Sequence, residues 1–326
     1  MGAEQRRPPL GVITGPTATG KTAVSIALAE RLARGAEIVS ADSMMVYRGM
    51  DIGTAKPSRV EMRGIPHHLI DVAEPDEPFS VARYRELAEA AVAGILARGR
   101  LPLLVGGTGL YIRAVLDEYH FAAPPDEGLR RELADAVRHH GPEWLHARLA
   151  EVDPVRASAI HPRNVRRVIR ALEIFRKTGR PPSSFAPRFE RGRERYAARV
   201  FGLFMDRERL YRRIEERVDA MLAAGLVAEV EGLLARGYRM DLPSMHGLGY
   251  KEIAAYLAGE IPYEEAVALL KRNTRRYAKR QFTWFKTDPR IHWIEVGENA
   301  DPMAVAEQIL VLTAGEPDWA AKQAYY

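Results

Sequence analysis

A glycine-rich segment near the start of the chain constrains its fold more than any other feature. The apolar run Leu10–Thr14 precedes the segment, and the helical pattern Thr22–Leu32 follows it. A strand, a glycine-rich turn and a helix in this order direct backbone N–H groups and a helix N-terminus at phosphate oxygens. We therefore expect an α/β domain and a ligand with at least two phosphate groups. The segment fits G-x-x-x-x-G-K-[ST] in every fixed position and comprises Gly15, Pro16, Thr17, Ala18, Thr19, Gly20, Lys21 and Thr22.

The last two residues of this segment suggest how the ligand is held. Lys21 supplies a positive charge, and the Thr22 hydroxyl is suited to binding Mg²⁺ beside the phosphates. The motif does not reveal whether a phosphoryl group is transferred. Nucleotide hydrolysis would favour an apolar strand that ends in aspartate, yet the run Leu101–Val105 ends in Gly106-Gly107-Thr108. The sequence thus predicts a phosphate site with Mg²⁺ as cofactor and leaves the reaction open.

Short apolar runs alternate with helical patterns across the first third of the chain. Such alternation is typical of a parallel sheet covered by helices on both faces. The expected strands are Leu10–Thr14, Glu37–Ser40, His68–Val72, Leu101–Val105, Val200–Phe204 and Ile291–Val296. The expected helices include Phe79–Arg98 and Arg207–Ala223.

Strand patterns disappear between residues 117 and 196, where helices rich in arginine and alanine replace them. Pro124 and Pro125 open this stretch, and a proline- and serine-rich segment followed by charged residues closes it. We expect residues 1–116 and 197–326 to form the core with C-terminal helices, and residues 117–196 to be an insert. The predicted fold class is α/β: a P-loop NTPase-like parallel sheet flanked by helices, with an inserted all-helical domain.

Composition excludes several kinds of chemistry. The 326 residues include no cysteine, which rules out disulfide scaffolds, cysteine-ligated zinc, iron–sulfur clusters and thiol catalysis. Lys and Arg number 48 against 43 Asp and Glu, so the formal charge is a modest +5. The start of the chain is short and polar, and no apolar run approaches the roughly 20 residues of a membrane span. We expect a cytoplasmic monomer with no membrane partner.

Asp42 is the leading candidate for a general base. It follows the expected strand Glu37–Ser40 closely, and the carboxyl ends of parallel strands form the edge at which ligands bind in open α/β folds. A carboxylate there lies near the glycine-rich segment and can accept a proton from a bound substrate. An aspartate in this position is equally suited to capping a turn, so the residues alone leave both roles open.

Two stretches concentrate positive charge. In the first, Arg163, Arg166, Arg167 and Arg170 recur at the i, i+3, i+4, i+7 spacing that places side chains on one helix face. Each stretch alone is equally consistent with a solvated amphipathic helix. Two such faces in one protein favour a bound polyanion.

The second basic stretch covers residues 271–286. Lys279 and Arg280 belong to its charged face, whereas Tyr277 and Trp284 fall together on another face. We expect these two aromatic side chains to lie in the core.

Several further blocks, in this order along the chain, resemble those of the bacterial tRNA dimethylallyltransferases, also called tRNA isopentenyltransferases. The resemblance extends from about residue 10 to about residue 295. It departs at Met45, where many members of the family carry glutamine. The blocks are Asp42–Tyr47, Met50–Pro57, His67–Asp71, Gly106–Tyr111 and Gly249–Glu252.

The resemblance implies a reaction. These enzymes transfer a dimethylallyl group from dimethylallyl diphosphate to the exocyclic amine of the adenosine 3′ of the anticodon in tRNA, and release diphosphate. The glycine-rich segment and Arg217 then hold the diphosphate of the donor. Asp42 corresponds to the carboxylate that takes a proton from the amine. Thr108 corresponds to a hydroxyl that contacts the target nucleotide or helps to position donor and metal.

The resemblance also implies that tRNA, through its anticodon stem-loop, contacts both parts of the chain, so the inserted domain is expected to bind tRNA. Arg130 corresponds to a position that approaches the target nucleotide. The expected tRNA contacts are Asp42, Ser43, Met44, Met45, Thr108, Arg130, Arg163, Arg166, Arg167, Arg170, Gly249, Tyr250, Lys251, Lys279 and Arg280.

Two other classes of function fit part of the sequence. A P-loop kinase for a small molecule or nucleoside, with the insert as its lid, would explain the glycine-rich segment and Asp42. It would leave Gly53–Pro57, Gly106–Tyr111 and the two basic faces unexplained. An RNA-binding ATPase switch would need a second carboxylate at the end of an apolar strand, and the sequence offers no convincing one. Prenyl transfer to tRNA is therefore our main prediction.

Overall fold

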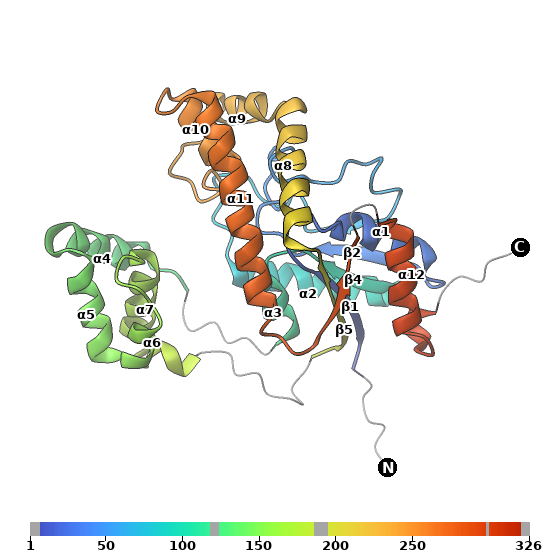
Figure 1. Ribbon diagram of the computed structural model, residues 1–326. Helices are drawn as coiled ribbons and strands as arrows, with labels where there is room; N and C mark the ends of the chain where they lie inside the picture. Colours follow the sequence, from blue (N-terminus) through green and yellow to red (C-terminus); the bar gives the residue numbers. More distant parts are fainter. Residues whose placement is uncertain (1–6, 118–123, 186–194, 298–299, 321–326) are drawn as a thin grey trace, which may run out of the picture. The chain divides into compact units, whose positions relative to one another are not determined.

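The computed structural model describes residues 7–117, 124–185, 195–297 and 300–320 (Figure 1). The chain divides into two compact units. The first consists of Met1–Leu116 and Glu194–Tyr326, and the second of Asp117–Arg193. In the part of the chain that is described, no helix is both long enough and apolar enough to cross a membrane.

A six-stranded parallel sheet with the order β3-β2-β4-β1-β5-β6 forms the centre of the first unit. In register, Val12 of β1 pairs with Leu104 of β4 on one side and with Val200 of β5 on the other. The loop after β1 therefore emerges in the middle of the carboxyl edge, where ligands bind in such sheets. The strands are β1 (Pro9–Thr14), β2 (Ala36–Ser40), β3 (His67–His68), β4 (Leu101–Val105), β5 (Ala197–Phe204) and β6 (Ile291–Glu295).

Helices cover both faces of this sheet (Figure 1). Side-chain caps start several of them; for example, the Ser80 hydroxyl accepts a hydrogen bond from the Arg83 amide at the start of α2. The helices of the first unit are α1 (Lys21–Arg31), α2 (Val81–Ala97), α3 (Gly109–Leu116), α8 (Arg207–Ala223), α9 (Leu226–Ala235), α10 (Tyr250–Leu257), α11 (Tyr263–Phe285), α12 (Pro302–Leu312) and the 3-10 helix η2 (Pro317–Trp319).

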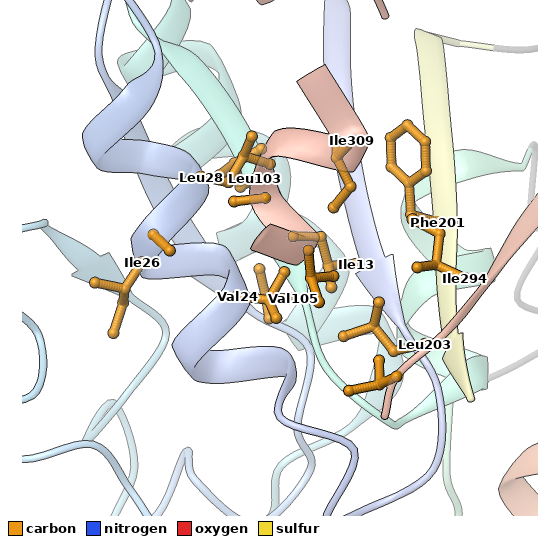
Figure 2. Close-up of a cluster of buried hydrophobic side chains, with 14 of the residues drawn as sticks. Ile13, Val24, Ile26, Leu28, Leu103, Val105, Phe201, Leu203, Ile294 and Ile309 are labelled. Atoms are coloured by element: carbon orange, nitrogen blue, oxygen red, sulfur yellow. The ribbon is translucent and has the colours of Figure 1, made fainter. Parts of the chain in front are cut away.

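Successive residues of a strand point to opposite faces of the sheet. Ile13 and Leu103 lie in a cluster with apolar side chains of α1 and α12, such as Ile309, as Figure 2 shows. Their neighbours Val12 and Leu104 lie in a second cluster with α2 and α3. Burial on both faces explains why the central strands read as continuous apolar runs.

The helices α8 to α11 form a third group, in which α8 and α11 lie side by side (Figure 1). Their buried residues, including Val218 and Leu226, pack against Val46 and Met50 from the segment that follows β2. The segment that carries Asp42 is therefore held between the sheet and these helices.

One predicted strand is wrong in extent. We expected His68–Val72, whereas β3 covers only His67–His68. Leu69 and Asp71 have φ values of 63° and 57°, and this left-handed conformation ends strand pairing. The turn brings the Asp71 carboxylate to the Lys56 ammonium at 2.6 Å.

The second unit is entirely helical in the part that the structure describes. Its core contains Leu133, Leu145, Leu149 and Val168. The fold class predicted from the sequence, a parallel sheet with an inserted helical domain, is confirmed. The elements are α4 (Glu127–His140), α5 (Pro142–Val152), α6 (Pro154–Ser158), α7 (Val165–Thr178) and the 3-10 helix η1 (Pro182–Phe185).

Candidate active site

The glycine-rich loop after β1 depends on two glycines. Gly15 has a φ of 132°, and a Cβ at this position would lie 2.2 Å from the backbone oxygen of Leu203. Gly20 has a φ of 85° and is the N-cap of α1. Residues with a side chain rarely adopt such φ values. The backbone conformation that orients the amide groups of this loop therefore depends on glycine at both positions.

Lys21 is the cation of the loop. Its ammonium group donates a hydrogen bond to the carbonyl oxygen of Pro16 at 2.6 Å. Burial and the charge of Arg217 lower the pKa of Lys21 to about 7, while Asp42 opposes this effect. A bound anion would favour the charged amine and raise its pKa again. The free site thus contains a lysine whose charge an anionic ligand would stabilise.

A cavity of about 870 Å³ opens over the loop, within the first unit. Among the expected ligands of the diphosphate, Gly15, Pro16 and Thr19 are outside the lining of this cavity, whereas the others lie in it. These lining residues are Thr17, Ala18, Gly20, Lys21, Thr22 and, from α8, Arg217.

Arg217 adds a second cation to this cavity. It forms no ion pair within the described parts of the chain. Burial lowers the pKa of its guanidinium from the ordinary value, and the charge of Asp42 partly offsets this. Two partly buried cations in one cavity repel each other, so an anion between them would be favoured.

Asp42 lines the same cavity. Its Oδ1 accepts hydrogen bonds from the backbone amides of Met44 at 2.8 Å and Met45 at 3.4 Å. The turn-capping role is therefore real. Among the described residues, the carboxylate makes no other hydrogen bond, so Oδ2 is available. One aspartate can thus fix its own turn through one oxygen and offer the other to a substrate.

Thr108 lies next to this turn. Its hydroxyl oxygen accepts a hydrogen bond from the Ser43 amide at 3.0 Å, and its own amide donates to the carbonyl of Ala41 at 3.0 Å. Ser43, Met44 and Met45 line the cavity. The loop after β4 therefore holds the Asp42 segment in place through these two hydrogen bonds. Thr108 itself does not line the cavity.

Two cavity residues of α11 were missed or misjudged in the sequence. Tyr277, expected in the core, lines the cavity, where burial and the charge of Asp42 raise the pKa of its phenol. Gln281, which the sequence did not single out, also lines it. The i, i+4 spacing of these two residues places both on one helix face and is the signal that could have found them. Trp284 is 43% exposed, so its expected place in the core is wrong.

The position of Trp284 has a local cause. A Cβ on Gly109 would lie 2.1 Å from its indole nitrogen, so the ring rests on the backbone of α3. The Arg113 guanidinium lies 6.0 Å from its ring centroid. The ring is therefore held at the surface by α3.

In the block around Gly249, Tyr250 makes structural contacts. Tyr250 is fully buried, and its hydroxyl donates to Glu229 at 2.6 Å. The same carboxylate accepts the amides of Asp51 and Ile52. Tyr250 therefore helps to fix the 51–53 loop and also lines the cavity, and its expected contact with tRNA stays a prediction.

The other residues of α10 and α11 that we expected to contact tRNA differ in whether they line the cavity. Lys251 and Arg280 line the cavity, whereas Gly249 and Lys279 do not. Lys279 is exposed on α11. Lys56, in the Met50–Pro57 block, is engaged within the fold, because its ammonium donates to Asp51 and Asp71.

In the second unit, two of the expected arginines are engaged with a buried carboxylate. Glu173 is fully buried and pairs with Arg130 at 2.9 Å and with Arg170. Its Oε1 also accepts the Asp126 amide at 2.6 Å, at the start of α4. Glu173 therefore orients both arginines while joining α4 to α7.

The expected four-arginine face is wrong at one end. Arg163 precedes the N-cap Asn164, and α7 starts at Val165, so Arg163 lies outside the helix. Arg166 and Arg167 are exposed in the first turn of α7. Positive charge is unfavourable at a helix N-terminus, which makes these two residues poor choices for stability alone.

Thr22 provides a test of whether Mg²⁺ fits. Within the described ranges, no group of three or more potential side-chain ligands could cage a metal ion. The Thr22 hydroxyl lines the cavity beside Lys21, and no hydrogen bond holds it among the described residues. Mg²⁺ typically binds through few protein groups, several waters and substrate phosphates. A hydroxyl beside a diphosphate site fits this mode.

The fold and cavity together define a P-loop α/β protein with a site for a phosphorylated ligand. The family model described as IPP transferase matches residues 45–288, and the one described as isopentenyl transferase matches residues 8–75. The tRNA dimethylallyltransferase of Desulforudis audaxviator (strain MP104C) is 59% identical over 303 residues, which cover 93% of this chain and 97% of the relative. The chain therefore belongs to the tRNA dimethylallyltransferase family.

Solved structures agree with this assignment. The full-length tRNA isopentenylpyrophosphate transferase of Bacillus halodurans is 46% identical, with a TM-score of 0.68 over 93% of this chain and 96% of that one. A eukaryotic dimethylallyltransferase acting on tRNA is 28% identical, with a TM-score of 0.78 over 97% of this chain and 81% of that one. The family resemblance identified from the sequence blocks is confirmed.

Proposed function

We propose that the protein transfers the dimethylallyl group of dimethylallyl diphosphate to the exocyclic amine of the adenosine 3′ of the anticodon in tRNA. The observation that carries this proposal is the cavity that Lys21, Arg217 and Asp42 line together. A leaving diphosphate needs the two cations, and a weakly nucleophilic amine needs the carboxylate. Family membership supplies the identity of the two substrates.

The donor side of the cavity stabilises the leaving group. Lys21, Arg217 and amides of the glycine-rich loop would surround the diphosphate and offset the negative charge that grows as its C–O bond breaks. Thr22 would hold Mg²⁺, which supplies further charge neutralisation when bound. The pKa of Lys21 near 7 would rise on diphosphate binding, since the anion stabilises its charged form.

The acceptor side of the cavity removes a proton. As the C–O bond to diphosphate breaks, the exocyclic nitrogen of adenine forms a bond to the allylic carbon. The nitrogen then carries an extra proton, and Asp42 accepts it through Oδ2, the oxygen that its turn leaves available. The products are N-dimethylallyl adenosine in tRNA and diphosphate, so atoms and charges balance.

Binding of the RNA draws on both units. A base that reacts inside the cavity must leave the stack of the anticodon loop, which costs a few kcal/mol. Contacts of phosphates with Arg166 and Arg167 in the second unit, and with Lys279 and Arg280 in the first, would offset this cost. Arg130 and Arg170 would contribute from fixed positions, because Glu173 holds them.

A product assay tests the proposal against its main alternative. The protein is incubated with Mg²⁺, unmodified tRNA and either dimethylallyl diphosphate or ATP. The tRNA is then digested, and the masses of its nucleosides are measured by mass spectrometry. We expect adenosine to gain one C₅H₈ unit with dimethylallyl diphosphate and nothing with ATP. A phosphorylated product with ATP, and no C₅H₈ gain, would instead support a kinase.

A further inference from the structure

Gln281 occupies a distinctive position between the two loops of the candidate site. It lies near the end of α11 and is 6% exposed. Its Oε1 accepts a hydrogen bond from the Thr17 amide at 2.8 Å, and its Nε2 donates to the carbonyl oxygen of Gly107 at 2.9 Å. One side chain thus joins the glycine-rich loop after β1 to the loop after β4.

The second of these loops leads directly to the acceptor side. Thr108 follows Gly107 and accepts the Ser43 amide at 3.0 Å, beside Asp42. A continuous path of bonds and hydrogen bonds therefore runs from the loop that would hold the diphosphate, through Gln281, to the turn of the proposed base. A shift of Gln281 would move these two parts of the site relative to each other.

The chemistry of this link suits an amide. A glutamine side chain has one acceptor oxygen and two N–H donors, whereas an ionised glutamate only accepts and a methionine does neither to a comparable extent. Thr17 presents a donor and Gly107 an acceptor. The amide of Gln281 satisfies both partners with two separate atoms, Oε1 and Nε2.

The same contact explains the glycine at position 107. A Cβ there would lie 2.1 Å from Nε2 and 3.2 Å from Cδ of Gln281, and the next atom, the Gly15 carbonyl oxygen, is 3.6 Å away. The last of these distances is an ordinary contact. The steric need for glycine at 107 therefore comes from Gln281 alone.

We propose that Gln281 is a positioning residue that sets the distance between the diphosphate of the donor and the Asp42 carboxylate. This inference rests on the proposed prenyl transfer. Reacting atoms in an enzyme must meet within a narrow range, and a misplacement of about 1 Å can lower the rate about 10²-fold. Loss of the link should thus reduce the chemical step more than the binding of either substrate.

The test compares four variants: Gln281→Glu, Gln281→Ala, Gly107→Ala and the double variant Gln281→Ala/Gly107→Ala. Gln308→Ala, on the exposed face of α12, is the matched control. For each protein we would measure the single-turnover rate at saturating dimethylallyl diphosphate and tRNA, the affinity for inorganic diphosphate with Mg²⁺, and the thermal midpoint. The diphosphate affinity and the thermal midpoint distinguish a misplaced site from a loss of fold.

We expect Gly107→Ala to lower the single-turnover rate by about 10- to 100-fold, with diphosphate affinity within about threefold of the parent. Gln281→Glu should lower the rate at least as much, and its added negative charge should also weaken diphosphate binding. The double variant should be no slower than Gln281→Ala, because Gly107→Ala meets no obstacle once the glutamine side chain is gone. Gln281→Glu keeps its size and its bond to Thr17, so it remains informative if Gln281→Ala fails to fold.

Three results would overturn this inference and leave the proposed function standing. The first is an unchanged rate in Gln281→Glu while the parent is active, and the second is a double variant whose loss of rate is the product of the two single losses. The third is an equal loss of rate and diphosphate affinity in Gly107→Ala, which adds no charge, because it would indicate a role in binding. Absence of prenylated product with the parent would overturn the proposed function, and this inference with it.

Discussion

Asp42 combines a structural and a chemical task in one side chain. Its Oδ1 holds the amides of Met44 and Met45, and its other oxygen is available to the cavity. The two tasks can be separated because asparagine keeps a carbonyl oxygen that accepts the same amides but is a far weaker base.

Asp42→Asn should therefore retain the fold and the donor site while losing most of the rate. We expect a decrease of about 10²–10⁴-fold in the single-turnover rate, as for removal of a general base. Thermal unfolding and diphosphate affinity serve as controls and should match the parent. A rate within a few fold of the parent would leave Asp42 as a turn residue only.

Lys21 leads to a prediction about protons. Its pKa is lowered to about 7 in the free protein by burial and by Arg217, so above pH 7 the amine is mostly neutral. A bound diphosphate stabilises the cation and raises the pKa, so binding above pH 7 should take up a proton. Below pH 7 the amine already carries its proton, and little uptake is expected.

Titration calorimetry of diphosphate binding in two buffers of different ionisation enthalpy measures this uptake. Lys21→Arg is the matched control, because arginine stays charged throughout this range. We expect proton uptake by the parent to exceed that of the variant at pH 8 and to equal it at pH 6. Equal uptake at both pH values would argue against a lysine that titrates on binding.

At the scale of elements, α7 separates two kinds of arginine. Arg170 is engaged with the buried Glu173, whereas Arg166 and Arg167 are exposed in the first turn. Arg176, further along α7, pairs with Glu132 at 2.7 Å. The residues of the first turn are therefore the candidates for phosphate contacts.

The double variant Arg166→Gln/Arg167→Gln should bind tRNA more weakly. Each lost phosphate contact should flatten the log–log dependence of affinity on salt by about one unit. Arg176→Gln removes a charge from the same helix and should leave the slope nearly unchanged. An equal change of slope in both proteins would point to a general effect of net charge.

Elements with a strong local signal could be predicted, and those set by distant contacts could not. The strands β1, β2 and β4 follow from apolar runs, and the glycine-rich loop follows from its motif. The expected strand at His68–Val72 failed because Leu69 and Asp71 adopt left-handed backbone angles. Leucine rarely does so, whereas aspartate does so more often than most residues.

The same limit applies to the site. Asp42 could be placed from its position after a strand, whereas the role of Gln281 depends on partners 264 and 174 residues away. The structural contact of Tyr250 was likewise not visible in the sequence, because its hydroxyl donates to Glu229, a carboxylate of another helix. Pairings between distant segments are decided by packing and leave little trace in local spacing.

At the scale of the whole molecule, the first unit contains every residue that lines the cavity. Its core is complete without the second unit, and Tyr196, which we expected in the insert, packs in the core beside the sheet. Donor binding should therefore require the first unit alone, whereas tRNA modification should require both.

Replacement of residues 117–193 by a short linker tests this division of labour. The shortened protein should bind dimethylallyl diphosphate with an affinity close to that of the full chain and should fail to modify tRNA. Retention of Tyr196 keeps the core intact, and a cooperative thermal transition checks this. Modification at near-parental efficiency would show that the helical unit is dispensable.

The central claim is that this cavity prenylates one adenosine of the anticodon loop. The most direct measurement uses a tRNA transcript with adenosine 3′ of the anticodon and a matched transcript with guanosine there, each incubated with deuterated dimethylallyl diphosphate and Mg²⁺. After nuclease digestion, mass spectrometry locates the label. We predict one labelled five-carbon unit at that adenosine, none in the guanosine transcript and almost none with Asp42→Asn. Label elsewhere in the RNA, or in neither transcript, would contradict the claim.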